Sequence, residues 1–232
     1  MSAFRFKHFS VEQSDVAMKV GTDGVLLGAW ADVEGADSVL DIGTGTGVIA
    51  LMVAQRSSAR RIVGVDIDEN AARCAAQNFA SSPWAERLSA VCKPAQEMDN
   101  GAYDLIISNP PYFSDSLLPP DVRRTMARHT TAITFAELDE TVCRLLAPQG
   151  RFALILPTDR MEEYARCSKL QMVRRCDVYP VPHGAVKRVM AEFVHPQNSV
   201  ECKVQTLTIE NGMRGDYTDE YRLLTKDFYL KF

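Results

Sequence analysis

Residues 39–51 read Val-Leu-Asp-Ile-Gly-Thr-Gly-Thr-Gly-Val-Ile-Ala-Leu, the most informative stretch of the chain. An apolar run closes on Asp41, three alternating glycines follow, and an apolar pattern of helical type then resumes. This order predicts a strand, a tight turn and a helix. Because Gly43, Gly45 and Gly47 carry no Cβ atoms, a small molecule can lie directly against the backbone of the turn.

A second strand-like run begins at Ile62 and ends in Asp66, a carboxylate that can accept hydrogen bonds from both hydroxyls of a ribose. The two motifs together predict a ligand that contains adenosine. A nicotinamide dinucleotide fits less well, because its fingerprint is Gly-x-Gly-x-x-Gly and here the third glycine, Gly47, comes one residue early. An ordinary turn, with Asp68 capping the following helix, is the alternative interpretation.

The composition narrows the class of protein. With 232 residues, 46% of them hydrophobic, the chain can bury a full core within one main domain. No apolar run reaches the ~20 residues that span a bilayer, and the N-terminus lacks a hydrophobic signal segment, so we expect a cytoplasmic protein without membrane contact. The six cysteines and four histidines show no ligand spacing, which predicts reduced thiols and no metal site. The net charge of −4 means that any polyanion must bind at a local basic patch.

From residue 38 onward, strand and helix patterns alternate, which predicts a mostly parallel sheet with helices on both faces. We expect strands at 38–42, 61–66, 88–92, 103–108, 150–156, 173–179 and 188–195, and helices at 47–55, 69–80, 134–147 and 160–169. Thr134 and Glu137 have the spacing of a capping box.

The two ends of the chain carry smaller elements. Strands 173–179 and 188–195 flank the turn Pro-Val-Pro-His-Gly and should pair antiparallel at the sheet edge. Residues 204–209 are a candidate for another edge strand, and residues from 218 onward for a helix or tail. Residues 1–37 predict a short hairpin and a helix, an accessory segment packed over the cofactor side of the sheet.

The second chemical motif follows strand 103–108 and reads Asn109-Pro-Pro-Tyr-Phe113. The side-chain carbonyl of Asn109 and the main-chain carbonyl of Pro110 can each accept one hydrogen of an amine, while the two prolines stiffen the turn. The ring of Tyr112 offers a face on which a planar base can stack. A long stretch without predicted elements then runs to residue 133, at the sheet edge where α/β proteins bind ligands. A rigid turn leaving a sheet is the alternative interpretation.

Together with the glycine turn and Asp66, this motif resembles the S-adenosylmethionine-dependent amino-methyltransferases, in which Asn-Pro-Pro-Tyr is the catalytic element. The resemblance implies an α/β Rossmann-like class I methyltransferase fold, with a seven-stranded, mostly parallel sheet and one antiparallel edge strand. It implies a methyltransferase domain at 38–232 behind the accessory segment 1–37. It also assigns catalysis to Asn109, Pro110, Pro111 and Tyr112, and base contact to Phe113.

More closely, the chain resembles the bacterial family that methylates the N6 amine of adenosine 37 in the anticodon loop of valine tRNA. The resemblance rests on the leader Phe4–Trp30, the Asn109 motif, the loop Arg123–His129 and the pair Lys187-Arg188. It implies tRNA as the partner of a protein that we expect to be a monomer. Guanine N2 of ribosomal RNA and a protein glutamine amide remain as alternative substrates, and a non-catalytic cofactor-binding module or a dehydrogenase as a different class.

The resemblance also implies site residues beyond the catalytic motif. Those assigned to S-adenosylmethionine are Lys19, Thr22, Asp41, Gly43, Thr44, Gly45, Gly47, Asp66, Ile67, Ala95, Gln96 and Asn109. Those assigned to RNA phosphates are Arg123, Arg124, Arg128, Lys187 and Arg188, with Arg174 and Arg175 near the second pair. For Lys19 and Thr22 a solvated lysine and a turn cap are the alternative, and for the arginines ordinary surface charge.

Overall fold

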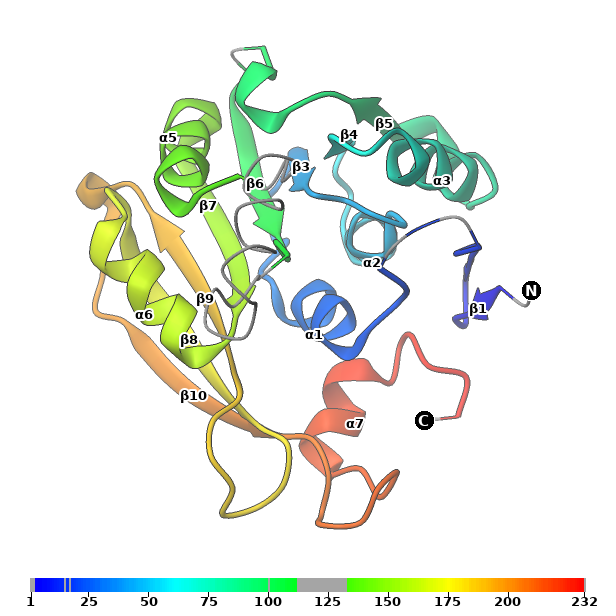
Figure 1. The fold of residues 1–232 in the computed structure, drawn as a ribbon, viewed down its shortest axis with the longest axis vertical. Coiled ribbons are helices and arrows are strands. Elements are labelled where there is room, and N and C mark those ends of the chain that lie inside the picture. Colours follow the sequence, from blue (N-terminus) through cyan, green and yellow to red (C-terminus); the bar gives the residue numbers. More distant parts are fainter. Residues whose placement is uncertain (1–2, 15, 17, 100, 112–132, 232) are drawn as a thin grey trace, which may run out of the picture.

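Eight strands form one sheet within the part of the chain that the computed structural model describes, residues 3–14, 16, 18–99, 101–111 and 133–231 (Figure 1). Five of them are parallel neighbours: β3 (Ser38–Ile42), β4 (Arg61–Asp66), β5 (Leu88–Cys92), β6 (Tyr103–Ser108) and β7 (Leu146–Leu156). The helices between them are α2 (Val48–Arg56), α3 (Glu69–Ala80) and α5 (Phe135–Leu145), with α6 (Thr158–Cys167) after β7. The predicted Rossmann-like alternation is confirmed.

The remaining strands correct the predicted sheet. They are β8 (Gln171–Tyr179), β9 (Arg188–Val194) and β10 (Lys203–Thr208), and the full order is β10-β8-β9-β7-β6-β3-β4-β5. Among the described residues the sheet has eight strands rather than seven, and its antiparallel strand, β9, lies between β7 and β8 rather than at the edge. Helix α6 connects β7 to β8 and leaves the position of one strand between them, which β9 occupies. Residues 189–193 are buried and all apolar except Glu192, which pairs with Arg174, and such a segment suits an interior strand.

Strand β7 begins earlier than the predicted residue 150. Tyr103 of β6 pairs with Leu146, whereas Leu105 pairs with Arg151, so an irregularity absorbs the intervening Pro-Gln-Gly segment. Helix α5 therefore ends at Leu145 rather than at residue 147. At its other end, the predicted capping box between Thr134 and Glu137 is present.

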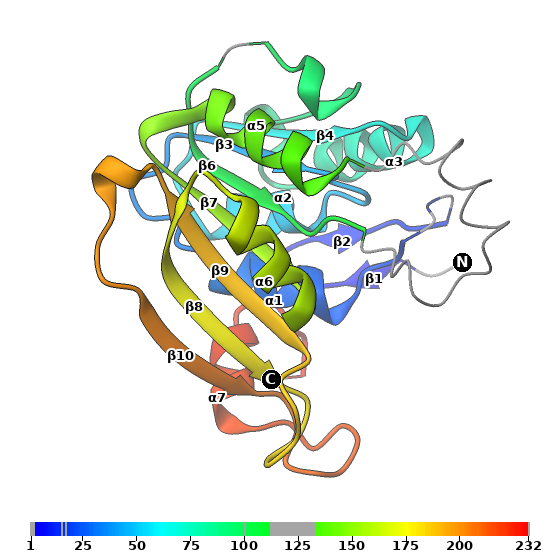
Figure 2. The ribbon, with the colours of Figure 1, turned by 60° about the vertical axis from the view of Figure 1, so that its left-hand side comes forward.

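Helices cover both faces of the sheet (Figure 2), with α5 and α6 on one side and α1 (Thr22–Trp30), α2 and α3 on the other. Alternate residues of β3 divide between the two cores, because Val39 packs with the α1–α2 side and Leu40 with the α5–α6 side. Short 3₁₀ turns lie at Ala85–Arg87 (η1), Ala95–Glu97 (η2) and Pro196–Asn198 (η3).

The two ends of the chain meet on the α1–α2 side. The N-terminal hairpin consists of β1 (Phe4–Arg5) and β2 (Ser10–Val11), and the last helix is α7 (Asp219–Thr225). Phe6 forms a backbone bridge with Tyr229, and their rings stack with centroids 5.9 Å apart. Phe6, Phe9 and Phe228 are buried in the same core cluster as α1 and α2.

Helices α1 and α2 approach closely through two glycines. A Cβ atom at Gly24 would lie 3.5 Å from Val48, and one at Gly28 would lie 2.8 Å from the sulfur of Met52. This packing places the start of α1 beside the start of α2, directly after the glycine turn. The guanidinium of Arg56 holds the end of α1 by donating to the carbonyls of Gly28 and Ala31 at 2.9 and 2.8 Å.

Two negative findings apply to the described residues. None of the helices there combines the length and the apolar character needed to cross a membrane. The same residues contain no group of three histidine, cysteine, aspartate or glutamate side chains placed to hold a metal ion.

Candidate active site

The neighbouring strands β4, β3 and β6 end next to one another at the carboxyl edge of the sheet. Ile42 of β3 is in register with Val65 of β4 on one side and with Ser108 of β6 on the other. The hydroxyl of Ser108 donates to the Ile42 carbonyl at 2.9 Å. The glycine turn, Asp66 and Asn109 therefore leave the sheet side by side, as their positions in the sequence predict.

The glycine turn has a backbone that other residues rarely adopt. Gly43, Gly45 and Gly47 have φ angles of 71°, 56° and 81°. Cβ atoms built at Gly43 and Gly45 would meet no atom of the described residues within 4 Å, so that part of the structure leaves room for a ligand above the turn. At Gly47 a Cβ atom would lie 2.4 Å from the ring of Phe79, which shows that the turn closes against α3.

Asp66 is held in place by backbone donors. One carboxylate oxygen accepts from the N–H of Gly45 at 2.9 Å, and the other from the N–H of Asp68 at 3.0 Å. Each oxygen keeps lone-pair capacity for a further donor, such as a ribose hydroxyl. Asp68 caps α3 by accepting from the N–H of Ala71 at 2.9 Å, so the capping role belongs to Asp68 and not to Asp66.

Asp41 is fully buried beneath the turn. The hydroxyl of Thr44 donates to one of its carboxyl oxygens at 2.7 Å, and the other oxygen has no hydrogen-bond partner among the described residues. Desolvation raises the pKa of Asp41 to about 7, and the nearby Asp66 adds to this. The hydrogen bond from Thr44 opposes the rise, and so does the N–H of Ala50, which points toward the carboxyl group without forming a hydrogen bond of ordinary geometry. Gly64 makes room for Thr44, because a Cβ atom there would lie 2.6 Å from the hydroxyl.

The Asn-Pro-Pro-Tyr motif is described as far as residue 111. Asn109 is half-buried, Pro110 is buried and Pro111 is exposed, directly after β6. Five predicted site residues lie outside the described residues: Tyr112, Phe113, Arg123, Arg124 and Arg128.

A residue that the sequence analysis missed, Asn78 of α3, ties the leader to the glycine turn. Its amide nitrogen donates to the carbonyls of Thr46 and Glu12 at 2.9 and 3.0 Å, and its amide oxygen accepts from the N–H of Glu12 at 2.8 Å. A second link closes the leader loop, where the N–H of Val20 donates to the side chain of Gln13 at 2.9 Å. The signal was a polar residue on the apolar stripe of α3, between Ala75 and Phe79.

The residues predicted to flank adenine follow β5. Ala95 is buried and Gln96 is exposed in the η2 turn, and Ile67 is 40% exposed beside Asp66. Arg144 of α5 fixes this turn by donating to the carbonyls of Gln96 and Met98, at 2.8 Å in each case. Its role also escaped the sequence analysis, since it depends on a contact between distant segments.

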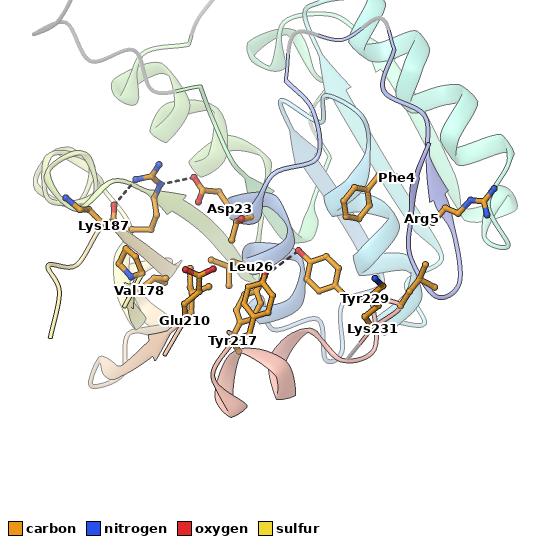
Figure 3. A pocket seen from close by; sticks show the side chains of 16 residues that line it. Phe4, Arg5, Asp23, Leu26, Val178, Lys187, Glu210, Tyr217, Tyr229 and Lys231 are labelled. Carbon is orange, nitrogen blue, oxygen red and sulfur yellow. Dashed lines mark hydrogen bonds and ion pairs between the residues drawn. The ribbon is translucent and has the colours of Figure 1, made fainter. Parts of the chain in front are cut away.

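The predicted site residues of the leader and the predicted basic residues do not all lie in one place. Lys19 is exposed ahead of α1, whereas Thr22, Lys187 and Arg188 line a groove of about 810 Å³ (Figure 3). Arg174 does not join them, because it pairs with the buried Glu192 at 3.2 Å and stacks over the ring of Trp30. The nearby Arg175 pairs with Asp177 at 2.7 Å.

The strand ends can hold a compound with a ribose and a positively charged group. Asp66 presents two oriented oxygens for hydroxyls, and the turn offers open space along its backbone. The unpartnered oxygen of Asp41 lies beneath the turn, where a cation would lower the pKa of that carboxyl. S-adenosylmethionine has both features, so the described residues fit it.

Comparison with known proteins identifies the family. Residues 9–135 match the methyltransferase small domain family. The tRNA1(Val) (adenine(37)-N6)-methyltransferases of Parabacteroides distasonis and Bacteroides fragilis are 45% and 43% identical to this chain, and each alignment covers 98% of both chains. That of Trichodesmium erythraeum is 43% identical and covers 99% of this chain and 98% of its own. The chain belongs to the tRNA1(Val) (adenine(37)-N6)-methyltransferase family.

Solved structures show that this family member shares its fold with other methyltransferases. A predicted O-methyltransferase of Agrobacterium tumefaciens superposes with a TM-score of 0.69 at 15% identity, covering 89% of this chain and 96% of its own. A ribosomal protein L11 methylase of Lactobacillus delbrueckii gives 0.55 at 16% identity, covering 78% and 82%. The predicted class I methyltransferase fold is thereby confirmed.

Proposed function

We propose that this methyltransferase transfers the methyl group of S-adenosylmethionine to the N6 amine of adenosine 37 in tRNA1(Val). The observation that carries the proposal is identity of 43–45% over nearly the whole chain to relatives of that name. The meeting of the glycine turn, Asp66 and Asn109 at one sheet edge supports it. The cofactor is S-adenosylmethionine, which supplies an electrophilic methyl group when bound.

Asn109 and Pro110 are the proposed acceptors for the target amine. The lone pair of an aromatic amine is delocalised into the ring, so the nitrogen is a weak nucleophile. Two carbonyl acceptors, one from the Asn109 side chain and one from the Pro110 backbone, hold both hydrogens and favour a pyramidal nitrogen. Proline at 110 and 111 stiffens this geometry, because its ring fixes φ. Positioning for in-line transfer supplies most of the catalysis.

The remaining proposed cofactor residues each contact one part of S-adenosylmethionine. Asp66 binds the ribose, the η2 turn with Ala95 and Gln96 flanks adenine, and Ile67 lies beside it. Asp41 and the glycine turn take the methionine end, with Lys19 and Thr22 of the leader closing over its carboxylate. Thr44 acts through its hydrogen bond to Asp41, since its side chain is turned into the core.

We also propose that residues 38–232 form the methyltransferase domain and that residues 1–37 serve as an accessory segment. Phe6 and Phe9 of this segment are buried in the core shared with α2, which argues for a fixed attachment. A monomer acting on tRNA in the cytoplasm is the simplest assembly for this function. Size-exclusion chromatography with light scattering tests the monomer.

The decisive experiment supplies the purified protein with methyl-labelled S-adenosylmethionine and an unmodified tRNA1(Val) transcript. We expect label in the transcript and N6-methyladenosine after nuclease digestion. A transcript with guanosine at position 37 is the matched control and should stay unlabelled. Label in that control as N2-methylguanosine, or transfer only to protein in a cell extract, would replace the proposed substrate with an alternative one.

Asn109→Ala tests the proposed chemistry. Loss of one acceptor for the amine should lower kcat by about a hundredfold or more. The affinity for S-adenosylmethionine, measured by calorimetry, should stay nearly intact. Equal losses of turnover and of cofactor affinity would contradict the assigned role.

A further inference from the structure

Ser108 is the last residue of β6 and directly precedes Asn109. Strand β6 lies beside β3, which in turn lies beside β4 (Figure 1). Ser108 is fully buried, and its hydroxyl donates to the carbonyl of Ile42 at 2.9 Å. Because Gly43 follows Ile42 in the chain, this hydrogen bond joins the strand that carries Asn109 to the first peptide group of the glycine turn.

The peptide group between Ile42 and Gly43 is held from both sides. Its carbonyl accepts from Ser108 of β6, and its N–H donates to the carbonyl of Val65 in β4 at 2.9 Å. Because a peptide group is planar, two hydrogen bonds that point to opposite sides fix its rotation as well as its place. The direction in which Gly43 leaves the strand, with a φ of 71°, therefore depends in part on the hydroxyl of Ser108.

The backbone that follows β6 soon lacks donors of its own. Pro110 and Pro111 have no N–H group, so these two residues cannot extend the ladder toward the glycine turn. The pairing between β3 and β6 ends where Ile42 is in register with Ser108. The hydroxyl of Ser108 therefore supplies a hydrogen bond at the place where the strands stop pairing and where the glycine turn and the Asn109 motif begin.

The glycine turn also has supports on the side of β4. The N–H groups of Gly43 and Thr44 both donate to the carbonyl of Val65, at 2.9 and 3.1 Å. The N–H of Gly45 donates to the carboxylate of Asp66 at 2.9 Å. The turn can therefore keep its shape and its contacts with a cofactor when the hydrogen bond from β6 is removed. What changes in that case is the place of the turn relative to β6.

We propose that Ser108 is a positioning residue for methyl transfer. Its hydroxyl fixes the distance and the angle between the cofactor held by the glycine turn and the amine held at Asn109. The proposal rests on the proposed function, because it needs both groups at these two strand ends. In-line transfer demands such alignment, and a displacement of about 1 Å can cost about a hundredfold in rate. Ser108 acts through Ile42 rather than on the substrate, since its own side chain is buried.

Ser108→Ala tests this role, because it removes the hydroxyl with little change in volume. We expect kcat for the tRNA1(Val) transcript, and the rate of a single turnover with the preformed complex, to fall by about tenfold or more. The affinity for S-adenosylmethionine, measured by calorimetry, and the KM for the transcript should stay close to the wild-type values. Thermal melting measures the folded fraction, so a loss of turnover through unfolding alone is recognised.

Ser38→Ala is the matched control. Ser38 begins β3, and its hydroxyl also joins this strand to the β6 segment, but at the amino edge of the sheet. The hydroxyl lies 3.1 Å from the carbonyl of Ala102 and 3.0 Å from the carboxylate of Asp104. The control should lose stability and keep the wild-type kcat. If Ser108→Ala does not fold, Ser108→Cys takes its place, because cysteine keeps a side chain of similar shape but is only a weak donor.

Two failures are distinguishable. A wild-type protein that transfers no methyl group to tRNA overturns the proposed function and the positioning role with it. A wild-type protein that labels adenosine 37, together with a Ser108 variant whose kcat matches that of the Ser38 control, overturns the positioning role alone. Parallel losses of kcat and of cofactor affinity would also overturn it, because Ser108 would then support the binding of the cofactor rather than its alignment with the amine.

Discussion

Asp41 and Asn78 are buried polar residues next to the glycine turn. The carboxyl group of Asp41 is buried in the core under the glycine turn, and Asn78 links that turn to the leader by hydrogen bonds. Asp41 could be predicted because it closes a strand within a recognisable motif. Asn78 could not, because its partners lie 32 and 66 residues away and no local pattern connects them.

The raised pKa of Asp41 makes stability depend on pH. The folded protein binds a proton at Asp41 up to about pH 7, whereas the unfolded chain loses it near the ordinary value of 3.8. The stabilisation that comes from the protonated carboxyl of Asp41 is therefore fully present below pH 3.8. It falls by about 1.4 kcal/mol per pH unit between pH 3.8 and about pH 7, and it is lost above that range. Asp41→Asn should lack this loss.

Urea unfolding of the cofactor-free protein at about pH 5 and about pH 8 measures the effect. We expect the free energy of unfolding of Asp41→Asn, relative to that of the wild type, to be higher at about pH 8 than at about pH 5. Asp37→Asn is the control, because Arg60 lowers the pKa of that exposed carboxyl and its ionisation is complete in both conditions. A constant difference between wild type and Asp41→Asn would show that Asp41 is already ionised at the lower pH.

Asn78→Asp tests the link between leader and turn. The substitution keeps an acceptor for the N–H of Glu12 but replaces the donor that reaches Thr46 and the Glu12 carbonyl. We expect weaker binding of S-adenosylmethionine, with about 1–3 kcal/mol lost from the free energy of unfolding. Calorimetry with the cofactor provides the measurement.

Asp139→Asn controls for instability alone. Asp139 is equally buried but lies on the α5–α6 side, where it accepts from Tyr164 and from the N–H of Lys169 at 3.1 and 3.0 Å. It should lose stability without losing cofactor affinity. If both variants bind the cofactor equally well, Asn78 has only a structural role.

At the scale of elements, the order of strands departs from the order of the chain. The sequence around residues 173–194 predicts an antiparallel pair, and the structure contains it. The strand of the pair that is buried on both faces takes the position between β7 and β8. All of residues 189–193 are buried, whereas β8 is only partly covered, so β9 takes the interior position.

The crossing of α1 and α2 gives a prediction with an internal control. Gly28→Ala would place a methyl group 2.8 Å from the sulfur and 3.1 Å from the Cβ of Met52. The strain should exceed the helix propensity gained and destabilise the fold by about 1–2 kcal/mol net. Urea unfolding measures this.

Gly24→Ala, one turn earlier, meets its nearest atom at the ordinary distance of 3.5 Å. It should be neutral or stabilising by up to about 1 kcal/mol. Equal effects of the two substitutions would mean that α1 and α2 shift apart without cost.

On the scale of the whole molecule, the ends of the chain complete one side of the core. The N-terminal hairpin bridges to the C-terminal segment through Phe6 and Tyr229, and both pack in the cluster that contains α1 and α2. The groove between them thus exists only when both ends are in place. This arrangement predicts that the ends unfold together with the core.

Phe6→Ala tests that cooperativity. Phe6 is 4% exposed, and its truncation should cost about 3–5 kcal/mol. The loss should appear as one transition that circular dichroism and tryptophan fluorescence report together, since Trp84 packs edge-on against Phe9 and Trp30 lies in the same cluster. An early separate transition in fluorescence would show that the hairpin is an independent unit.

Local patterns were enough to predict the parallel βα core, the glycine turn beside Asp66 and the position of the Asn109 motif. Each of these follows from residues adjacent in the chain: glycines that accept positive φ, alternating apolar runs, and parallel strands whose carboxyl ends share an edge. The interior place of β9, the link through Asn78 and the groove between the chain ends arise from contacts between distant segments. Such contacts depend on which apolar surfaces remain to be buried once the core has formed, so they became visible only in the folded molecule.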